Sequence, residues 1–276
     1  MTMPDWFYDL PIYIASVMML MVCNAVSLLG YWFYTRDLIR IDNREIVTKV
    51  VWQTVLYFST VFIAFWIVTT WNNLGDLKQT TIREANTVAM LYHDLNSLPT
   101  DQRVMLEKKL SSYLDSVVND EYKSLAGGHE NQTTNARYNE LASAIYNYQP
   151  DVTLASELRY NRILLHLSQL SDYREERLSY LDGSLSGPML IFFLTMIMVG
   201  CFWTGFIETR SFRFTLFIII SQNLIMGSSS WLILEMDKPF EGQFSVTNAP
   251  FITIQKEINL AATTVVNDKS SVYSTK

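Results

Sequence analysis

Four long stretches of this sequence contain no charged residue. No Asp, Glu, Lys or Arg occurs in residues 10–35, 50–75, 183–207 or 214–234. The shortest stretch holds 21 residues. At about 1.5 Å per residue, a helix of that length extends roughly 31 Å, which is enough to cross roughly 30 Å of hydrocarbon. Soluble cores rarely need four such runs, so the sequence predicts four transmembrane helices.

Signatures of catalysis and of nucleic-acid binding are also missing. The sequence has no GxxxxGK[ST] phosphate loop, no HExxH pair, no CxxC and no GxSxG elbow. The three histidines, His93, His129 and His166, do not have metal-ligand spacing. No run is rich in Lys or Arg, and the formal net charge is −6. We therefore expect no enzyme, no metal or other cofactor, and no nucleic-acid partner.

Cysteines and basic residues are scarce at the positions where they would signal processing. The two cysteines, Cys23 and Cys201, each lie inside a predicted span, where a small thiol usually just packs. The first nine residues contain two acids and no base, whereas a cleaved signal peptide needs a basic start. We expect the first span to remain as an anchor in the lipid bilayer.

The charged residues that the spans lack are concentrated in one insert. Helical spacing of leucines runs up to Pro99, resumes after an expected N-cap at Thr100, recurs near 135–148 and starts again at about Thr153. We therefore predict an all-α protein with a helical bundle inserted between the second and third spans. The expected segments are a domain at 1–75 with spans at about 10–34 and 50–72, a bundle at 76–182, a domain at 183–237 with spans at about 187–207 and 214–235, a turn and short helix at 238–262, and a disordered tail at 263–276.

The short loops between spans predict the orientation. Segments 36–49 and 208–213 together carry six basic residues, and the N-terminal flank carries none. Under the positive-inside rule these loops face the cytoplasm. We therefore expect both termini and the 76–182 bundle to be extracytoplasmic, in a bacterial inner membrane.

The fourth span contains more polar side chains than a plain lipid anchor needs. Asn223, Ser230 and Asp237 recur every seven residues and align on one side of a helix, with Gly227 between them. Gln222 and Asn223 at mid-span should face protein or water, because lipid cannot bond to their amides. Packing between helices and the lining of a pore or cavity both explain this pattern, and the sequence leaves both open.

Two acids end the fourth span, next to the unfavourable end of the helix dipole. Lys238 directly follows Asp237 and could offset one of the two acids as a local pair. If several subunits surround an axis, the same acids become a ring at the outer mouth that favours cations.

The turn that follows carries a resemblance to a known family. Residues 232–242, LILEMDKPFEG, and then Ser245-Val246 resemble the signature that closes the fourth span of an uncharacterised bacterial membrane family described as bestrophin-like. Its sharp part is the turn with Pro239, Phe240 and Gly242. Segments Arg83-Glu84-Ala85, Leu91-Tyr92, and Tyr113 through Val117-Val118 to Glu121 also look like that family's insert.

The resemblance has implications of its own. Bestrophins are pentameric four-span anion channels, so it implies a homo-oligomer and channel activity. It also implies that the region between the second and third spans is cytosolic, opposite to the orientation that the basic loops favour. Three functions remain open: a homo-oligomeric channel with a path along the fourth span, a non-conducting scaffold whose bundle binds a protein partner, and a sensor that signals through its bundle.

Overall fold

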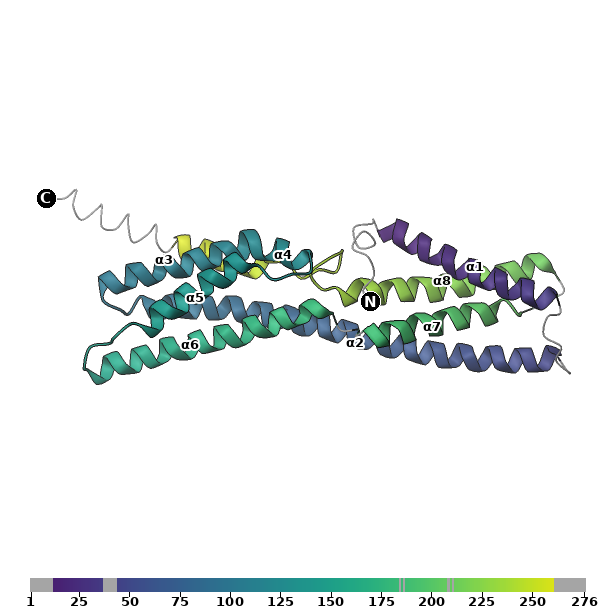
Figure 1. Ribbon diagram of the computed structural model, residues 1–276, viewed down its shortest axis with the longest axis horizontal. Helices are drawn as coiled ribbons and strands as arrows, with labels where there is room; N and C mark the ends of the chain where they lie inside the picture. The colour runs from purple at the N-terminus through teal and green to yellow at the C-terminus, as the bar shows by residue number, and fades with distance from the viewer. Residues whose placement is uncertain are drawn as a thin grey trace. The chain divides into compact units, whose positions relative to one another are not determined.

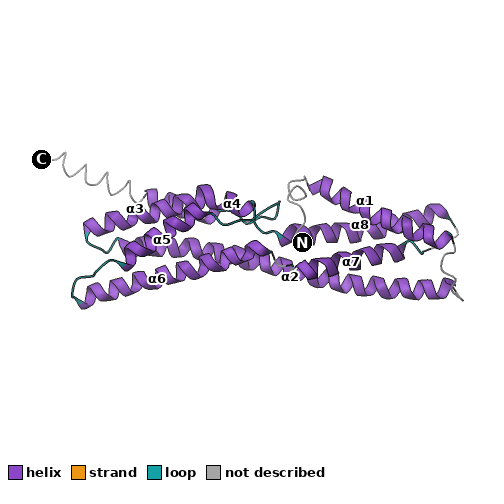
Figure 2. Ribbon diagram, viewed as in Figure 1, coloured by secondary structure: helices purple, strands orange, loops and turns teal. Residues whose placement is uncertain are grey.

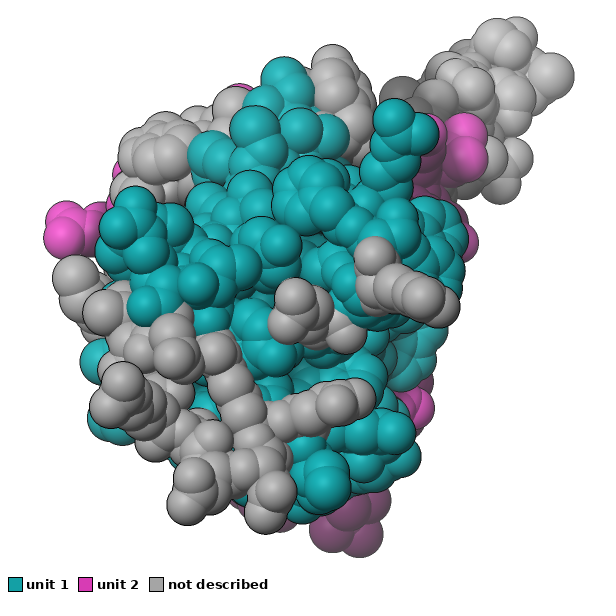
Figure 3. Space-filling model, turned by 90° about the vertical axis from the view of Figure 1, so that its right-hand side faces the viewer, with its two compact units in different colours: residues 1–74, 183–245 teal, residues 75–182, 246–276 magenta. Residues whose placement is uncertain are grey.

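The computed structural model describes residues 12–36, 44–183, 185, 187–207, 209 and 211–260. Within these residues all regular elements are helices, which confirms the predicted all-α class (Figures 1 and 2). The chain divides into two compact units, residues 1–74 with 183–245 and residues 75–182 with 246–276 (Figure 3). The tail predicted at 263–276 lies outside the described residues.

The first unit contains the apolar helices. They are α1 (Ile12–Thr35), the first part of α2 (Arg44–Leu95), α7 (Gly187–Thr204) and α8 (Phe212–Asp237). All four are long and apolar enough to cross a membrane. Pro188 lies in the first turn of α7, where its missing N–H leaves no helical hydrogen bond unmade. The predicted spans at 187–207 and 214–235 correspond to α7 and α8.

Two glycines allow α1 and α7 to approach backbone to backbone. A Cβ placed on Gly30 of α1 would lie 2.1 Å from the carbonyl oxygen of Phe202 in α7. A Cβ placed on Gly205, directly after α7, would lie 2.0 Å from the carbonyl oxygen of Ser27 in α1. Real Cβ atoms cannot occupy such positions, so this crossing requires glycine on both sides. Small residues play this role wherever apolar helices pack closely in membranes.

The four apolar helices are buried to different extents. In the most apolar stretch of α8, 39% of the residues are buried inside the protein, against 17% in that of α2. α8 packs on α1, and α1 packs on α7 (Figure 1). α2 touches α7 through the rings of Phe62 and Phe192, whose centres are 5.6 Å apart. The core of this unit is built mainly from α1, α7 and α8, while α2 adds Ile63 and Trp66 to it and presents most of its surface outward.

The second unit is a helical bundle with a leucine-rich core. Its elements are the second part of α2, α3 (Thr100–Ser116), a π-helical turn (Val117–Glu121), α4 (Tyr122–Ala126), α5 (Gln132–Tyr146), α6 (Leu154–Ser179), a 3-10 turn (Tyr180–Asp182) and a helix at 249–260. Apolar residues of α2, α3, α5, α6 and the 249–260 helix share one core. The last helix is held by Phe251, which is fully buried, and by Asn248, whose amide donates to the Val118 carbonyl at 2.7 Å.

The helix starts in this unit follow ordinary capping chemistry, with one correction to the sequence analysis. α3 begins at Thr100 itself, and Pro99 is the N-cap, so Thr100 is not the cap expected from the sequence. Pro99 suits this place because its fixed φ ends the preceding chain without needing a hydrogen-bond donor. Asn131 caps α5 by accepting from the Thr134 N–H at 2.9 Å, and Thr153 caps α6 through the Ser156 N–H at 3.2 Å.

The α1–α7 crossing can be tested with one methyl group. Gly30→Ala should lower the free energy of unfolding by about 1–3 kcal/mol or more, because the new Cβ collides with backbone that cannot move aside easily. The matched control is Gly75→Ala in α2, where no heavy atom lies within 4 Å of the added Cβ. That change should be neutral or stabilise by up to about 1 kcal/mol. Thermal unfolding in detergent measures both, and equal losses would contradict the close crossing.

Candidate functional site

The polar side chains of the fourth span meet those of the first. Asn223 of α8 is fully buried, and its amide donates to Ser27 Oγ at 2.9 Å and to Asn24 Oδ1 at 3.1 Å, both in α1. Ser27 Oγ in turn donates to the Cys201 carbonyl of α7 at 2.6 Å. We call Asn24, Ser27 and Asn223 the membrane polar cluster. It joins three helices by hydrogen bonds, which is the packing role that the sequence left open for Asn223.

The other fourth-span candidates have different surroundings. Gly227 faces α1, and a Cβ added there would lie 3.5 Å from Leu20 Cα. Ser230 is fully buried and donates to the Met226 carbonyl of its own helix at 2.6 Å. Gln222 is partly exposed, and its amide makes no hydrogen bond to any residue that the structure describes. Of the four candidates, Gln222 is therefore the one whose polar group still needs a partner.

Glu235 joins the end of α8 to the turn that follows. One of its carboxylate oxygens accepts from the Gln243 N–H at 2.8 Å. Gly242 has a φ of +70°, and a Cβ there would lie 2.1 Å from Glu235 Oε1. Both the backbone conformation and the space therefore require glycine. Pro239 and Phe240 are buried in the same turn, so the motif found in the sequence is a folded structure around the Glu235 carboxylate.

Asp237 performs a similar task on the other side of the helix end. Its Oδ1 accepts from the Leu185 N–H at 2.8 Å, in the segment that leads into α7. Gly183, with a φ of +73°, passes close to the same residue. Lys238 donates to Glu241 at 3.1 Å. The two outer-mouth candidates thus bond to backbone of their own chain, which accounts for acids at an unfavourable helix end.

A second polar cluster, which the sequence analysis did not assemble, lies inside the bundle. Arg177 of α6 is fully buried and donates to Glu84 of α2 from Nε at 2.5 Å and from Nη2 at 3.0 Å. Its Nη2 also reaches Glu121 Oε2 at 2.7 Å. Arg174, one turn earlier in α6, donates to Glu121 Oε1 at 2.9 Å. We call Glu84, Glu121, Arg174 and Arg177 the bundle charge cluster; its formal charges cancel.

Local structure and aromatic rings hold this cluster in place. Glu121 is the last residue of the π-helical turn after α3, and such a turn re-aims the side chains that follow it. The Tyr113 hydroxyl donates to Glu84 at 3.2 Å. The Arg177 guanidinium lies over the rings of Tyr122 and Phe251 at 5.6 and 5.7 Å. Rings around a desolvated guanidinium add a favourable cation–π contribution.

The protonation states of the cluster follow from its burial. Burial, aided by Glu84 and Glu121, raises the pKa of Tyr113 well above its usual value. Burial is also the main reason that the pKa of Tyr122 is raised to about 12. Burial lowers the pKa of Arg177, but the charges of Glu84 and Glu121 outweigh that effect and the pKa stays well above normal. Both hydroxyls are thus neutral and the guanidinium is charged at physiological pH.

The arrangement suits structure and coupling better than catalysis. Both carboxylates are engaged by guanidinium groups, so neither is available as a base or a metal ligand. Among the described residues, no three His, Cys, Asp or Glu side chains converge in a way that could hold a metal. The cluster ties α2, the π-helical turn and α6 together through charges that would be very costly if left unpaired.

A sequence signal for this cluster existed. Glu84 lies seven residues from Leu77 and Leu91, and all three are fully buried. Arg177 falls in the same way on the stripe of Ile163 and Leu170 in α6. A charged residue on the apolar stripe of a helix must find a buried partner of opposite sign. Pairing such positions across the insert would have predicted the cluster.

Removing one charge from this cluster should be far costlier than breaking a surface pair. Glu84→Gln keeps the shape of the side chain but leaves Arg177 with one carboxylate fewer, and we expect the bundle to lose about 3–5 kcal/mol of stability. The matched control is Glu107→Gln, whose partner Arg103 has a side chain that is 32% exposed; we expect a loss under about 1 kcal/mol there. Chemical denaturation followed by circular dichroism compares the two. Similar losses for both variants would show that the cluster is energetically ordinary.

Comparison with known proteins places this architecture. A family model described as the bestrophin-like domain matches residues 21–251. Solved structures of a bacterial bestrophin homologue from Klebsiella pneumoniae are similar in fold. One point variant has 13% sequence identity and a TM-score of 0.66 over 89% of this chain and 97% of its own. The structure phased with zinc has 14% identity and a TM-score of 0.63 over 89% of this chain and 97% of its own. A further structure, described only as a membrane protein variant, has 14% identity and a TM-score of 0.66 over 88% and 96%. No curated protein matches the chain by sequence.

Proposed function

The chain belongs to the family of proteins with a bestrophin-like domain, and from this premise we propose that it is a homo-oligomeric ion channel of a bacterial inner membrane. Bestrophins, for which the family is named, are channels rather than enzymes. The bundle of the second unit takes no part in chemistry under this proposal. Under this proposal the lipid bilayer surrounds the first unit, and the protein partner of the chain in the membrane is another copy of the same chain.

The observation that carries the proposal is the poor burial of α2. Only 17% of its most apolar stretch is buried, against 22% in α1, 33% in α7 and 39% in α8, although Ile63 and Trp66 of α2 reach the shared core. The centre of its outward face carries Tyr57 and Val61, each 67% exposed, and Val68, 58% exposed. A span left so open within one chain has surface for neighbouring subunits and for a path between them.

The chemistry of this face suits a hydrophobic constriction. Thr54 and Thr60 donate their hydroxyl hydrogens to carbonyls of their own helix, at 2.9 Å in each case. What remains outward at mid-span is largely valine and aromatic. Apolar rings of this kind gate channels by excluding water when narrow. We therefore place the path along α2 in preference to the line of Asn223, Ser230 and Asp237, whose polar groups have partners inside the chain.

Gln222 supports the oligomer independently. Its amide lies in the middle of α8 and has no hydrogen-bond partner among the described residues. Placing an amide in hydrocarbon without a hydrogen-bond partner costs several kcal/mol of free energy. Under the proposal a second copy supplies the missing partner. Gln222 then faces a neighbouring copy, in line with the prediction that a mid-span amide faces protein or water, and Asn223 packs between helices.

The proposed orientation follows the basic loops. With loops 36–49 and 208–213 in the cytoplasm, both termini and the bundle are extracytoplasmic. The resemblance to bestrophins gives the opposite placement of the bundle, and impermeant labelling of a cysteine at Ser124 distinguishes the two. A scaffold or sensor role of the bundle is the second candidate, favoured by a pocket beside its charge cluster.

Ion flux from liposomes tests the channel directly. Purified protein should give flux under a chloride gradient or a potassium gradient, each paired with an impermeant counter-ion. Val61→Ser adds a hydroxyl to the proposed constriction and should change that flux by about threefold or more. The matched control is Leu224→Ser on the outward face of α8, where the native side chain is 54% exposed; it should change flux by less than about twofold.

Each other outcome has a definite meaning. Flux that responds to Leu224→Ser and not to Val61→Ser would move the path back to the fourth span. Absence of flux from a protein shown to be folded and assembled would contradict the channel and favour the scaffold.

A further inference from the structure

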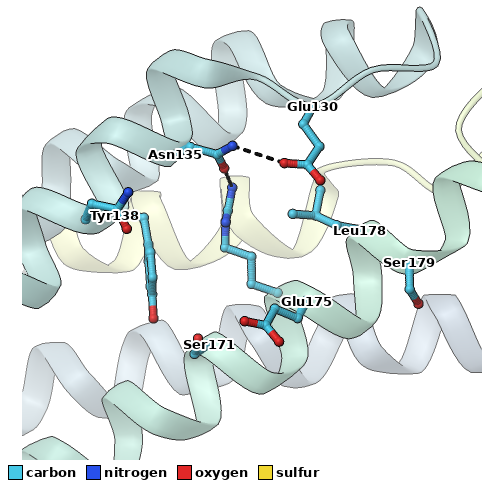
Figure 4. A pocket seen from close by; sticks show the side chains of 9 residues that line it. Glu130, Asn135, Tyr138, Ser171, Glu175, Leu178 and Ser179 are labelled. Atoms are coloured by element: carbon cyan, nitrogen blue, oxygen red, sulfur yellow. Dashed lines mark hydrogen bonds between the residues drawn. The ribbon is translucent and has the colours of Figure 1, made fainter.

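A pocket opens on the bundle beside the charge cluster. Its volume is about 540 Å³, within the usual range for small-molecule sites. It lies between α5 and α6, and Figure 4 shows Asn135 and Tyr138 on one side and Ser171, Glu175, Leu178 and Ser179 on the other. Glu130, from the segment before α5, closes one end and accepts a hydrogen bond from the Asn135 amide at 3.1 Å.

Arg174 makes the inner wall of this pocket. The residue is only 7% exposed, and its Nη2 donates to both Glu121 and Asn135. Its Nε is enclosed without a partner, so the donor open to a ligand is Nη1, which makes no hydrogen bond to any described residue. The guanidinium is held over the Tyr138 ring at 5.4 Å. A buried cation with unused donors is costly to leave unsatisfied, and guanidinium groups bind carboxylates in preference to most other partners.

The rest of the lining has the opposite charge. Glu130 and Glu175 are exposed acids on the pocket wall, and Glu175 makes no ion pair with another described residue. The oxygens of Ser171 and Asn139 lie on the same lining. Two carboxylates with neutral acceptors and an aromatic face are the surroundings that an ammonium group prefers.

A ligand with a single charge does not match both the guanidinium and the acids of this pocket. An inorganic anion would meet Arg174 but would be repelled by two acids, while a simple amine would meet the acids but would lie beside a buried guanidinium. We propose that the pocket binds a small zwitterion, such as a free amino acid, with its carboxylate on Arg174 and its ammonium group toward Glu130 and Glu175. This binding goes beyond ion conduction and does not depend on it.

A ligand bound in the pocket would affect the bundle charge cluster, because Arg174 belongs to both. Arg174 shares Glu121 with Arg177, and Arg177 holds Glu84 on α2. A carboxylate bound to the unused side of Arg174 partly neutralises its guanidinium, which weakens the attraction of Arg174 for Glu121. Glu121 then interacts more strongly with Arg177, and the ion pair between Arg177 and Glu84 is weakened. Two ion pairs, Arg174–Glu121 and Glu121–Arg177, thus link the pocket to the Arg177–Glu84 contact that fixes α2 in the bundle.

Calorimetric titration of the full chain in detergent tests the proposal. The probes are glycine, L-serine and 5-aminopentanoate, which separate their two charges by different distances, with acetate and ethylammonium as single-charge controls. At least one zwitterion should bind saturably, and each single-charge control at least about tenfold more weakly. Absence of binding by all three zwitterions up to about 10 mM would overturn the proposal, as would acetate or ethylammonium binding equally well.

Variants show where the zwitterion binds. Glu175→Gln should weaken binding by about tenfold, because it removes one partner of the ammonium group from an exposed position where folding is not at stake. The matched control is Glu176→Gln, the next residue of α6, which is exposed and does not line the pocket; its binding should equal that of the unchanged protein. Arg174→Lys should also weaken binding by about tenfold or more, provided that it folds. If Glu175→Gln and Glu176→Gln bind alike, the site is elsewhere and the proposal fails.

Discussion

The contact on which the membrane unit depends is the close crossing of α1 with α7. Backbone meets backbone at Gly30 and Gly205, and the approach is near enough for Ser27 to bond the Cys201 carbonyl and for Asn223 to bond Ser27. Close packing and buried hydrogen bonds are what hold helices together where lipid offers no hydrophobic driving force. α1, α7 and α8 pack mainly on one another, while α2 reaches this core through Ile63 and Trp66 and keeps most of its apolar surface uncovered.

In the bundle, buried ion pairs play the organising part that close backbone packing plays in the first unit. Its core is leucine-rich, but at its centre two arginines and two glutamates neutralise each other out of contact with water. Such a cluster adds little net stability, but losing one of its members is strongly destabilising because each buried charge is costly without its partners. It therefore specifies how α2, the π-helical turn and α6 meet. Arg174 also lines the neighbouring pocket.

Much of the fold was predictable because it depends on local patterns. Charge-free stretches predicted the apolar helices, and leucine spacing with Pro99 and Pro150 predicted the helices of the bundle to within a few residues. Partners distant in sequence were harder to foresee. Asn223 was singled out as a polar residue in a span, but Ser27, 196 positions away, has no feature that marks it as its partner. Likewise Glu84 and Glu121 lie in segments that resemble the family's insert, whereas only its place on the apolar stripe of α6 marks Arg177 as their partner.

The central claim is that α2 borders a water-filled path while α8 faces protein and lipid. Accessibility of single cysteines to a small, charged thiol reagent tests it most directly, since the native Cys23 and Cys201 are both buried. In native membranes, Val61→Cys should react at a rate well above that of Leu224→Cys, although both positions lie near the middle of a span. Equal, slow reaction at both would mean that no water reaches α2, and faster reaction at Leu224→Cys would place the path on α8; either result would contradict the claim.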